Sequence, residues 1–404
     1  MYPDFQEPSP ILLRNARWVL LILGLCFSFI PSLKAEEPKS PIGAWAGPPE
    51  LLFDSDTSAC EPLDIPDANP RAFRDADGQV HLFATHYTAR AMVGPSLNAV
   101  RNNCGVVYRS PQNADPSQFL DRNWLDSFFT ADGKVVVALV HSEYQAWTHP
   151  GKCLSSPAGR VNCWWNSITM AVSKDGGFAF EEPPPPRNLV ATAPYRFDGA
   201  NQDGPVGYLQ PTNILQFGQA YYAIMLARKF RAQKYGACLM RSDNLLDPTS
   251  WRGWDGQGFT VRFVDPYRVS GKADAQPVCE PLGNHAIYAP GSINYYSPQK
   301  LFVATEFTSD GRFGPKGLYM TASKDLVHWS EPNLIATTVS MIEAEGPGHW
   351  DFGYFGLLDP TSKDRNFLNI SDAPYVYYVR FNRARGNLSR DLVRRQVRLR
   401  FPQD

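Results

Sequence analysis

Carboxylic acids beside β-rich stretches are the residues of this chain best suited to chemistry. Glu143 and Glu306 each end an apolar run, and Asp67 precedes the predicted strand at 71–74. Carboxyl groups brought into one pocket can act as general acid and general base. Plainer interpretations exist, because Asp67 can cap a turn and Glu143 can brace a loop through a salt bridge. We treat these three residues as candidate catalytic groups.

Further polar and aromatic side chains lie close to the same connecting segments. His86 and His141 could bind a ligand or move protons, although a hydrogen-bonded loop histidine is the more common case. Trp147, Trp164 and Trp165 flank a polar loop, where an indole face could stack on a sugar ring instead of packing within the fold. The side chains expected to contact a ligand are His86, His141, Trp147, Trp165, Gln210, Asn213 and Arg228.

A turn motif that recurs three times indicates how these residues are positioned. It begins at Ser173, returns at Ser242 ahead of Trp251, and returns again at Ser323 ahead of Trp329. The Asp of each copy stands at 175, 243 or 325, so the copies are 68 and 82 residues apart. Ser and Asp side chains fix such turns by bonding the downstream backbone. A turn repeated at this period is typical of small sheets arranged radially, as in a β-propeller.

Composition and hydrophobic pattern also favour an all-β fold. Aromatic residues make up 13% of the 404 residues, and 35 Pro and 30 Gly suit many short strands joined by turns. The stretch at 393–401 alternates between apolar and polar residues, and we expect it to be the outer strand of the last blade. The other strands are expected at 71–74, 79–85, 126–130, 134–140, 167–172, 212–216, 220–227, 237–241, 292–296, 300–305, 318–322, 355–358 and 374–381.

These strands predict a five-bladed β-propeller over residues 60–404, with long loops on one face. If each innermost strand runs away from the functional face, that face carries two kinds of loop. Loops entering a first strand are expected at 64–71, 195–211, 276–291 and 343–353, and loops joining second to third strands at 86–94, 141–165, 228–236 and 306–316. Most of the candidate residues fall in these loops, so one rim would gather them.

The N-terminus predicts export. Arg14 and Arg17 precede an apolar run at 19–30, and the sequence SLKA at 32–35 offers a cleavage site before Glu36. Such a run is short for a membrane span and suits a signal peptide, although an uncleaved anchor would tie the protein to a membrane. We expect a signal peptide at 1–35, a linker or edge-covering arm at 36–59, and a secreted or periplasmic protein.

Cysteine usage agrees with an oxidising compartment. Removal of 1–35 takes away Cys26 and leaves six cysteines, an even number that favours disulfides in an exported chain. Free buried thiols are the alternative, and six cysteines can pair in many ways. The pairing that we favour joins neighbours in order, as Cys60–Cys104, Cys153–Cys163 and Cys238–Cys279.

Charge and motifs exclude several classes of function. A net charge of −1 gives no broad basic surface of the kind that binds nucleic acid. The sequence has no CxxC, phosphate loop, dinucleotide fingerprint, zinc-protease motif or G-x-S-x-G elbow. We therefore expect no cofactor and no metal, with nothing in the sequence to support an ion on the axis. We also expect a monomer.

Four stretches carry a resemblance to a known group. VALVHSEYQ (137–145), CWWNSITMAVSKDGG (163–177), GLLDPTSKDRNF (356–367) and SRDLVRRQVRLRF (389–401) resemble exported five-bladed propellers of the glycoside-hydrolase kind, the arabinanase, xylosidase and levansucrase-like clans. The turn at 323–329 fits the same group, and the resemblance covers most of 60–402. It implies carboxylates at the mouth of the axis, with the base, here Asp67, at the start of blade one. Relatives would carry an Asp in blade three, where this chain has Gln210 and Asn213.

Three hypotheses follow from the residues and the resemblance together, and one of them is a structural or scaffolding propeller, which an axial mouth plugged by side chains would favour. The first is an exported glycoside-hydrolase-like protein that cleaves a glycan through Asp67, Glu143 and Glu306. The alternative is a carbohydrate-binding propeller that holds a sugar without turnover. Two carboxyl groups within about 10 Å in one pocket would favour the first. A pocket of Trp, Arg and amide side chains alone would favour the second.

Overall fold

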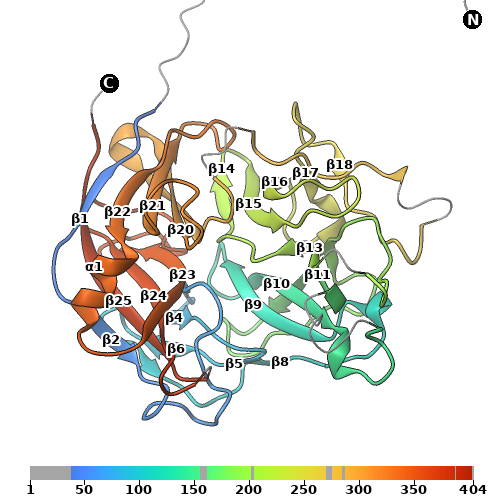
Figure 1. Ribbon diagram of the computed structural model, residues 1–404, viewed down its shortest axis with the longest axis horizontal. Helices are drawn as coiled ribbons and strands as arrows, with labels where there is room; N and C mark the ends of the chain where they lie inside the picture. Colours follow the sequence, from blue (N-terminus) through green and yellow to red (C-terminus); the bar gives the residue numbers. More distant parts are fainter. Residues whose placement is uncertain are drawn as a thin grey trace, which may run out of the picture. The chain divides into compact units, whose positions relative to one another are not determined.

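Strands are the dominant regular structure of the chain (Figure 1). The computed structural model describes residues 38–154, 162–201, 204–269, 275–283, 287–386 and 388–402, so the predicted signal peptide lies outside the described residues. Within these ranges α1 (Thr338–Glu345) is the single α-helix. The described part of the chain contains no helix with the length and apolar character needed to span a membrane.

The first three blades use residues from the N-terminal two thirds of the chain. Blade 1 contains β3 (Arg71–Arg74), β4 (Val80–Phe83), β6 (Met92–Gly94) and β7 (Arg101–Asn102), with the pair β5 (Thr88–Ala89) and β8 (Tyr108–Arg109) in its loops. Blade 2 contains β9 (Arg122–Phe129), β10 (Val136–Gln145), β11 (Trp164–Ser173) and β12 (Leu189–Ala191). Blade 3 contains β13 (Val206–Leu209), β14 (Leu215–Phe217), β15 (Ala220–Ala227), β16 (Gly236–Ser242), β17 (Arg252–Gly253) and β18 (Val261–Arg262).

The last two blades complete the set. Blade 4 contains β19 (Ser292–Tyr296), β20 (Leu301–Thr308), β21 (Gly317–Ser323) and β22 (Asn333–Thr337). Blade 5 contains β23 (Trp350–Leu358), β24 (Tyr375–Asn382) and β25 (Arg390–Arg400), with β1 (Ile42–Trp45) and β2 (Glu50–Phe53) beside β25. The described residues include the 3-10 helices η1 (Pro116–Gln118), η2 (Ala146–Thr148), η4 (Pro248–Ser250) and η6 (Ser297–Gln299).

The innermost strands of the five blades meet around a central axis (Figure 1). Strand β3 contacts β9 on one side and β23 on the other, and β23 contacts β19. Blade 3 is joined to blade 2 by the parallel pairing of β13 with β11 and by Ser127 of β9, which donates to the carbonyl of Thr212. It is joined to blade 4 by Asn213, which bonds the backbone of Ile293. Each blade therefore touches two others, which makes the ring a five-bladed propeller.

Apolar side chains fill the space between each pair of neighbouring blades. In the described part of the chain there are five such interfaces, so every blade is packed on both faces. This explains why central strands such as β10 read as nearly continuous apolar runs. Representative pairs, in order around the ring, are Phe83 and Phe128, Leu139 and Tyr208, Ile224 and Phe302, Val303 and Phe355, and Leu82 and Tyr377.

The N-terminal strands close the ring, which corrects one expectation from the sequence. Strand β25 pairs with β24 on one edge and with β1 and β2 on the other. The stretch at 393–401 is therefore a third strand and not the outer strand of its blade. The outermost position belongs to residues 42–45 and 50–53, within the segment expected to be a linker or an edge-covering arm. A buried edge of β25 needs these partners for its backbone groups.

The recurring turns are fixed as their residue types predict, with one exception. Asp175 accepts from two downstream amides, and Asp325 does the same in the third copy. In the second copy Asn244 takes over this role by accepting from the amide of Leu246, while Asp243 pairs with Arg241. The aromatic residues that follow are buried between blades: Phe180, Trp251 and Trp329.

The three disulfides join the cysteine pairs that the sequence analysis favoured. The bonds are Cys60–Cys104, Cys153–Cys163 and Cys238–Cys279. The first ties the segment before β3 to the end of β7, the second closes the loop between β10 and β11, and the third holds β16 to the segment before β19. Two of the three therefore brace segments that lead into innermost strands.

Trp251 tests the packing between blades 2 and 3. Its indole is 1% exposed in the apolar interface that blades 2 and 3 share, so Trp251→Ala should lower the free energy of unfolding by about 3–5 kcal/mol. The measurement is urea unfolding with the disulfides intact. Leu246, which is 58% exposed in the same turn, is the control, and Leu246→Ala should change the value by no more than about 0.5 kcal/mol. Equal unfolding midpoints for Trp251→Ala and the wild type would contradict the interface.

Candidate active site

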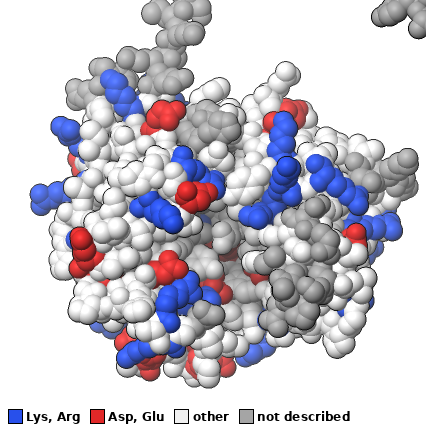
Figure 2. Space-filling view, in the orientation of Figure 1, with Lys and Arg blue, Asp and Glu red and all other residues white. Residues whose placement is uncertain are grey.

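Three carboxyl groups from two blades line one cavity beside the axis. They are Asp67, before β3, and Asp126 and Glu143, on β9 and β10. A hollow with acidic atoms in its depth is visible near the middle of the face shown in Figure 2. The other residues that line the cavity are Ala68, Asn69, Trp124, His141, Gln210 and Tyr354.

Asp67 is held by groups from blade 5. Its Oδ1 accepts a hydrogen bond from the hydroxyl of Tyr354 at 2.8 Å, and the guanidinium of Arg390 contacts the same oxygen. The Nε2 of His86 lies 3.6 Å from Oδ2. Burial raises the pKa of Asp67, whereas Arg390 and Tyr354 act to lower it. The side chain is therefore fixed in place by three partners and still lines the cavity.

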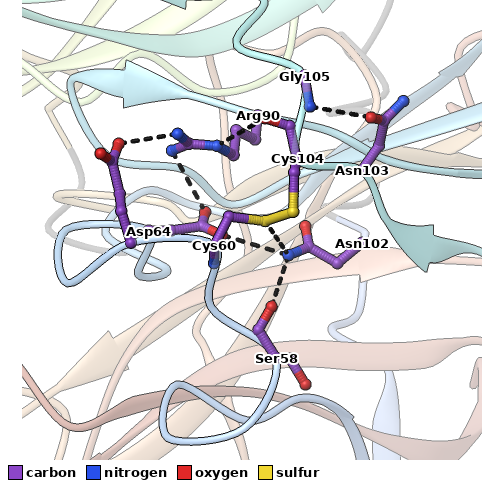
Figure 3. Close-up of a disulfide and its surroundings, with 9 residues drawn as sticks. Ser58, Cys60, Asp64, Arg90, Asn102, Asn103, Cys104 and Gly105 are labelled. Carbon is purple, nitrogen blue, oxygen red and sulfur yellow. Dashed lines mark hydrogen bonds and ion pairs between the residues drawn. A yellow bond between two sulfur atoms is a disulfide. The ribbon is translucent and has the colours of Figure 1, made fainter.

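A disulfide and one arginine fix the segment that carries Asp67 (Figure 3). Cys60 is bonded to Cys104, and the carboxylate of Asp64 accepts from the amide of Cys60 at 2.9 Å and from Asn102 at 3.2 Å. Arg90 donates to Glu61 at 2.8 Å and to the carbonyl of Cys104 at 3.1 Å. Because these bonds end three residues before Asp67, its backbone has little freedom to move.

Glu143 and His141 lie on the same face of β10. Residues two apart on a strand share one face, so both side chains of β10 point toward the cavity. His141 Nδ1 lies 3.6 Å from the carboxyl of Glu143, and its Nε2 bonds Asn166 at 3.0 Å. Burial raises the pKa of Glu143 to about 8, with Asp67 and Asp126 adding to the shift. Burial lowers the pKa of His141 to about 4. At neutral pH the acid is therefore protonated and the imidazole is uncharged.

Asp126 is the cavity residue that the sequence analysis missed. It stands in the middle of β9, where all but the first residue are buried, and its Oδ1 has no hydrogen-bond partner among the described residues. Burial raises the pKa of Asp126 to about 7, while the nearby charge of Arg71 acts to lower it. The available signal was a carboxylic acid at the start of the strand predicted at 126–130, because such a group is rarely buried without a purpose.

The two histidine candidates differ in their relation to the cavity. His141 lines it, whereas His86 stands behind Asp67 and packs on the indole of Trp124 with ring centroids 5.7 Å apart. Burial and the charges of Arg390 and Arg122 lower the pKa of His86 to about 3. His86 therefore positions Asp67 as an uncharged ring.

Blade 3 brings an amide to the cavity. Gln210 directly follows β13, has a left-handed φ of 47°, and lines the cavity. Asn213, also expected to contact a ligand, uses both of its amide atoms for the backbone of Ile293 at 2.7 and 2.8 Å. Asn213 thus joins blade 3 to blade 4, and the structure places only Gln210 at the cavity.

Glu306 is not part of this cavity lining. Its carboxyl group accepts hydrogen bonds from the amides of Tyr288 and Ala289, at 2.8 to 3.1 Å. Burial raises the pKa of Glu306 to about 7. The three bonds hold the segment that leads into β19, so the structure gives Glu306 a bracing role. Its position at the end of a strand resembled that of Glu143, but the neighbouring backbone captures it.

The remaining ligand candidates lie outside the cavity. Trp147 and Trp164 pack edge to face with ring centroids 6.2 Å apart, and Trp165 contacts Phe197 at 5.7 Å. All three indoles are half-buried. Arg228 lies over the ring of Tyr235 at 5.4 Å. Among the described residues, no group of three or more His, Cys, Asp or Glu side chains is arranged to hold a metal ion.

Comparison with known proteins supports the fold. No family model and no curated protein matches the sequence. A family 117 glycoside hydrolase from the marine bacterium Zobellia galactanivorans matches with a TM-score of 0.50 at 8% identity, over 89% of this chain and 90% of that one. The catalytic domain of a Coprinopsis cinerea GH62 α-L-arabinofuranosidase matches with a TM-score of 0.46 at 13% identity, over 89% and 97%. The likeness to the family 117 structure shows the propeller fold that the sequence predicted, and at this identity it shows the fold alone.

Glu143 should make the stability of the protein depend on pH. Its pKa is about 8 in the folded state and about 4.3 in an unfolded chain. Between these values the folded state keeps a proton that the unfolded state releases, so the free energy of unfolding decreases as pH rises toward 8. Glu143→Gln should remove part of this decrease and stabilise the protein at pH 8.5 by roughly 2–5 kcal/mol relative to the wild type. Urea unfolding at pH 5 and pH 8.5 measures it.

The matched control removes an exposed carboxyl group. Asp77 lies in the turn between β3 and β4, at the end of the blade away from the cavity, and is exposed. Asp77→Asn should leave the difference in stability between the two pH values as it is in the wild type. If Glu143→Gln also left that difference unchanged, Glu143 would not hold a proton in the folded protein.

Proposed function

We propose that this protein is an exported glycoside-hydrolase-like enzyme that cleaves a glycan by acid–base catalysis at the mouth of the propeller. The observation that carries the proposal is the convergence of Asp67, Asp126 and Glu143 on one cavity. Hydrolysis of a glycosidic bond needs one carboxyl group that gives a proton and one that is ionised. The cavity supplies candidates for both roles.

Glu143 is the proposed general acid. Burial and the two neighbouring acids keep its proton in place at neutral pH, with a pKa of about 8. A carboxyl group with a raised pKa can protonate the oxygen of the leaving sugar as the bond breaks. Asp126 contributes to this state, because its charge adds to the cost of ionising Glu143.

Asp67 is the proposed base or nucleophile. Of the three acids it is the one in contact with a guanidinium, that of Arg390, and this contact favours the carboxylate form. It also accepts from Tyr354, which fixes the direction of its oxygens. A carboxylate held in this way can activate water or attack the sugar directly. Proton transfer of this kind requires no cofactor, so we propose none.

One observation favours the alternative of binding without turnover. Blade 3 presents Gln210 to the cavity, where the resemblance to glycoside hydrolases led us to expect an acid. An amide can hydrogen-bond a sugar hydroxyl but cannot give or take a proton at neutral pH. A screen of glycans and aryl glycosides, with calorimetry on every ligand that binds, separates the two. Binding without any product would support the alternative, and release of sugar would support the enzyme.

Substitution of the cavity acids tests the roles. Asp67→Asn, Asp126→Asn and Glu143→Gln should each lower kcat on a substrate found in the screen by roughly 10²–10⁴-fold, because each removes a carboxyl group from the reaction. Unfolding curves at pH 6 show whether each variant is folded. Asp77→Asn, on the opposite face, should retain the wild-type kcat. A Glu306→Gln variant as inactive as Glu143→Gln would return Glu306 to the catalytic set and displace our assignment.

The pH profile of turnover should reveal the acid. Since Glu143 must be protonated to act, kcat should fall as pH rises above about 8, the pKa of Glu143. The measurement is kcat at saturating substrate from pH 4 to pH 10, with enzyme stability checked at each pH. A profile that is flat through this alkaline range would show that the proton comes from another group.

A further inference from the structure

The loop that joins β15 to β16 is strongly basic. Residues 228–236 contain Arg228, Lys229, Arg231 and Lys234, and none of the nine is acidic. The loop joins a second to a third strand, so it lies at the end of blade 3 that faces the candidate active site. A run of basic residues usually forms a solvated surface. Here Arg228 contacts an aromatic ring, which indicates a more specific role.

Two guanidinium groups are held on aromatic rings at this loop. Arg228 lies over the ring of Tyr235 at 5.4 Å, and Arg312, from the loop after β20, lies over Tyr235 at 5.7 Å and over Tyr288 at 4.2 Å. The rings of Tyr235 and Tyr288 are 6.1 Å apart. The four side chains form one cluster from blades 3 and 4, which we call the arginine–tyrosine cluster. An arginine stacked in this way keeps its N–H edge free for a planar anion.

The charge of Arg228 is not neutralised by an ion pair among the described residues, in contrast to two neighbouring basic side chains. Arg312 is paired with Asp310 at 2.5 Å, and Lys234 with Glu280 at 2.6 Å. Arg228 has neither an ion pair nor a side-chain hydrogen bond among the described residues, and its guanidinium is only half-buried. Its five N–H donors therefore remain for a partner from solution. Basic side chains gather over the upper right of the face in Figure 2, whereas acidic atoms occupy the central hollow.

The cluster is joined to the cavity by a short series of contacts. The amide of Arg228 donates to the carbonyl of Gly207 at 2.9 Å, and Gly207 is paired with Asn166. Asn166 bonds His141, which lies beside Glu143 in the cavity. Gly207 is required here, because a Cβ at this position would lie 1.9 Å from the carbonyl oxygen of Asn166. These contacts link the segment that carries Arg228 to the wall of the cavity.

We propose that the arginine–tyrosine cluster binds an acidic group of the glycan, a carboxylate or a sulfate, on a residue next to the one in the cavity. This inference rests on the proposed function for its ligand class. The stacked guanidinium of Arg228 offers two parallel N–H groups, which match the two oxygens of a carboxylate. The cavity offers an anion no unpaired cation, because Arg390 contacts Asp67 and Arg71 lies near Asp126. We therefore place the neutral sugar in the cavity and the charged sugar at the cluster.

The first experiment compares two forms of one polymer. Calorimetry measures binding of short oligomers of rhamnogalacturonan, in which galacturonate alternates with a neutral sugar, and of the same oligomers after methyl esterification, which removes the charge and keeps the sugar ring. We expect the acidic form to bind at least tenfold more tightly at low salt and to weaken as NaCl is added. A parallel titration with sulfated galactan oligomers separates carboxylate from sulfate recognition. Equal affinity for charged and uncharged forms of both polymers would overturn the proposal.

The second experiment uses matched arginine variants. Arg228→Gln should weaken binding of the acidic oligomer about tenfold or more, because a hydrogen bond to a charged group is lost. Arg400 is the control, since it is exposed at the end of β25, whereas Arg390 at the start of that strand contacts Asp67. Arg400→Gln removes the same charge from the far end of the blade and should bind as the wild type does. An equal loss in both variants would show unspecific attraction and overturn the proposal.

The binding experiments can succeed or fail independently of the test for hydrolysis. Binding is measured without turnover, and Glu143→Gln should still bind the acidic oligomer if the cluster acts as inferred. Acid-dependent binding that requires Arg228, with no sugar released from any glycan, would sustain the cluster and remove the hydrolytic function. Hydrolysis that requires Glu143 but is indifferent to Arg228 and to substrate charge would sustain the enzyme and remove the cluster.

Discussion

A buried guanidinium at the centre of the ring constrains everything around it. Arg71, at the start of β3, donates to the carbonyl of Pro70 in its own blade and to that of Pro211 in blade 3. Blade 5 approaches so closely that a Cβ on Gly356 would lie 2.9 Å from the Pro70 carbonyl and 3.5 Å from the guanidinium. Burial lowers the pKa of Arg71 to about 10, so the group is still charged at neutral pH. A buried cation of this kind needs a nearby acidic side chain to offset the free-energy cost of its burial.

The chemistry of the cavity follows from that constraint. The charge of Arg71 interacts with the carboxyl group of Asp126, and the ring of blades brings Asp67 and Glu143 into the same cavity as Asp126. Water is largely excluded from all three, so ionising every one of them would place several negative charges in a poorly solvated space. Ionisation is unfavourable for Glu143, whose pKa is raised to about 8 and which has no ion-pair contact to a guanidinium. Asp67, in contrast, contacts Arg390. In the mechanism that we propose, the charge of Arg71 thereby helps to distinguish Glu143, the proposed proton donor, from Asp67, the proposed base.

The sequence predicted the strands well where packing is local and poorly where it is not. The strands at 220–227 and 292–296 were predicted with the bounds that the structure shows, because their apolar runs lie between clear turns. Strands β1 and β2 were not predicted as strands, since their partner β25 lies about 340 to 360 residues away and the segment 42–53 is interrupted by Gly43, Gly47 and the pair Pro48–Pro49. The three disulfide pairs followed from sequence order, because each closes a loop within a blade or between neighbours.

The site was predictable only in part, for a reason that concerns hydrogen bonds. Glu143 and Glu306 end equivalent strands of different blades and look alike in the sequence, yet the amides of Tyr288 and Ala289 turn toward Glu306 and fix it. Glu143 instead accepts from the side chain of Gln145 at 2.6 Å. Whether backbone amides reach a carboxyl group depends on the course of the loop opposite, which neither residue type nor spacing records. Asp126 shows the converse, because an acid whose Oδ1 has no partner among the described residues was taken for an ordinary part of its strand. In a propeller the innermost strands supply the floor of the cavity, so an acid on such a strand deserves the same weight as one in a loop.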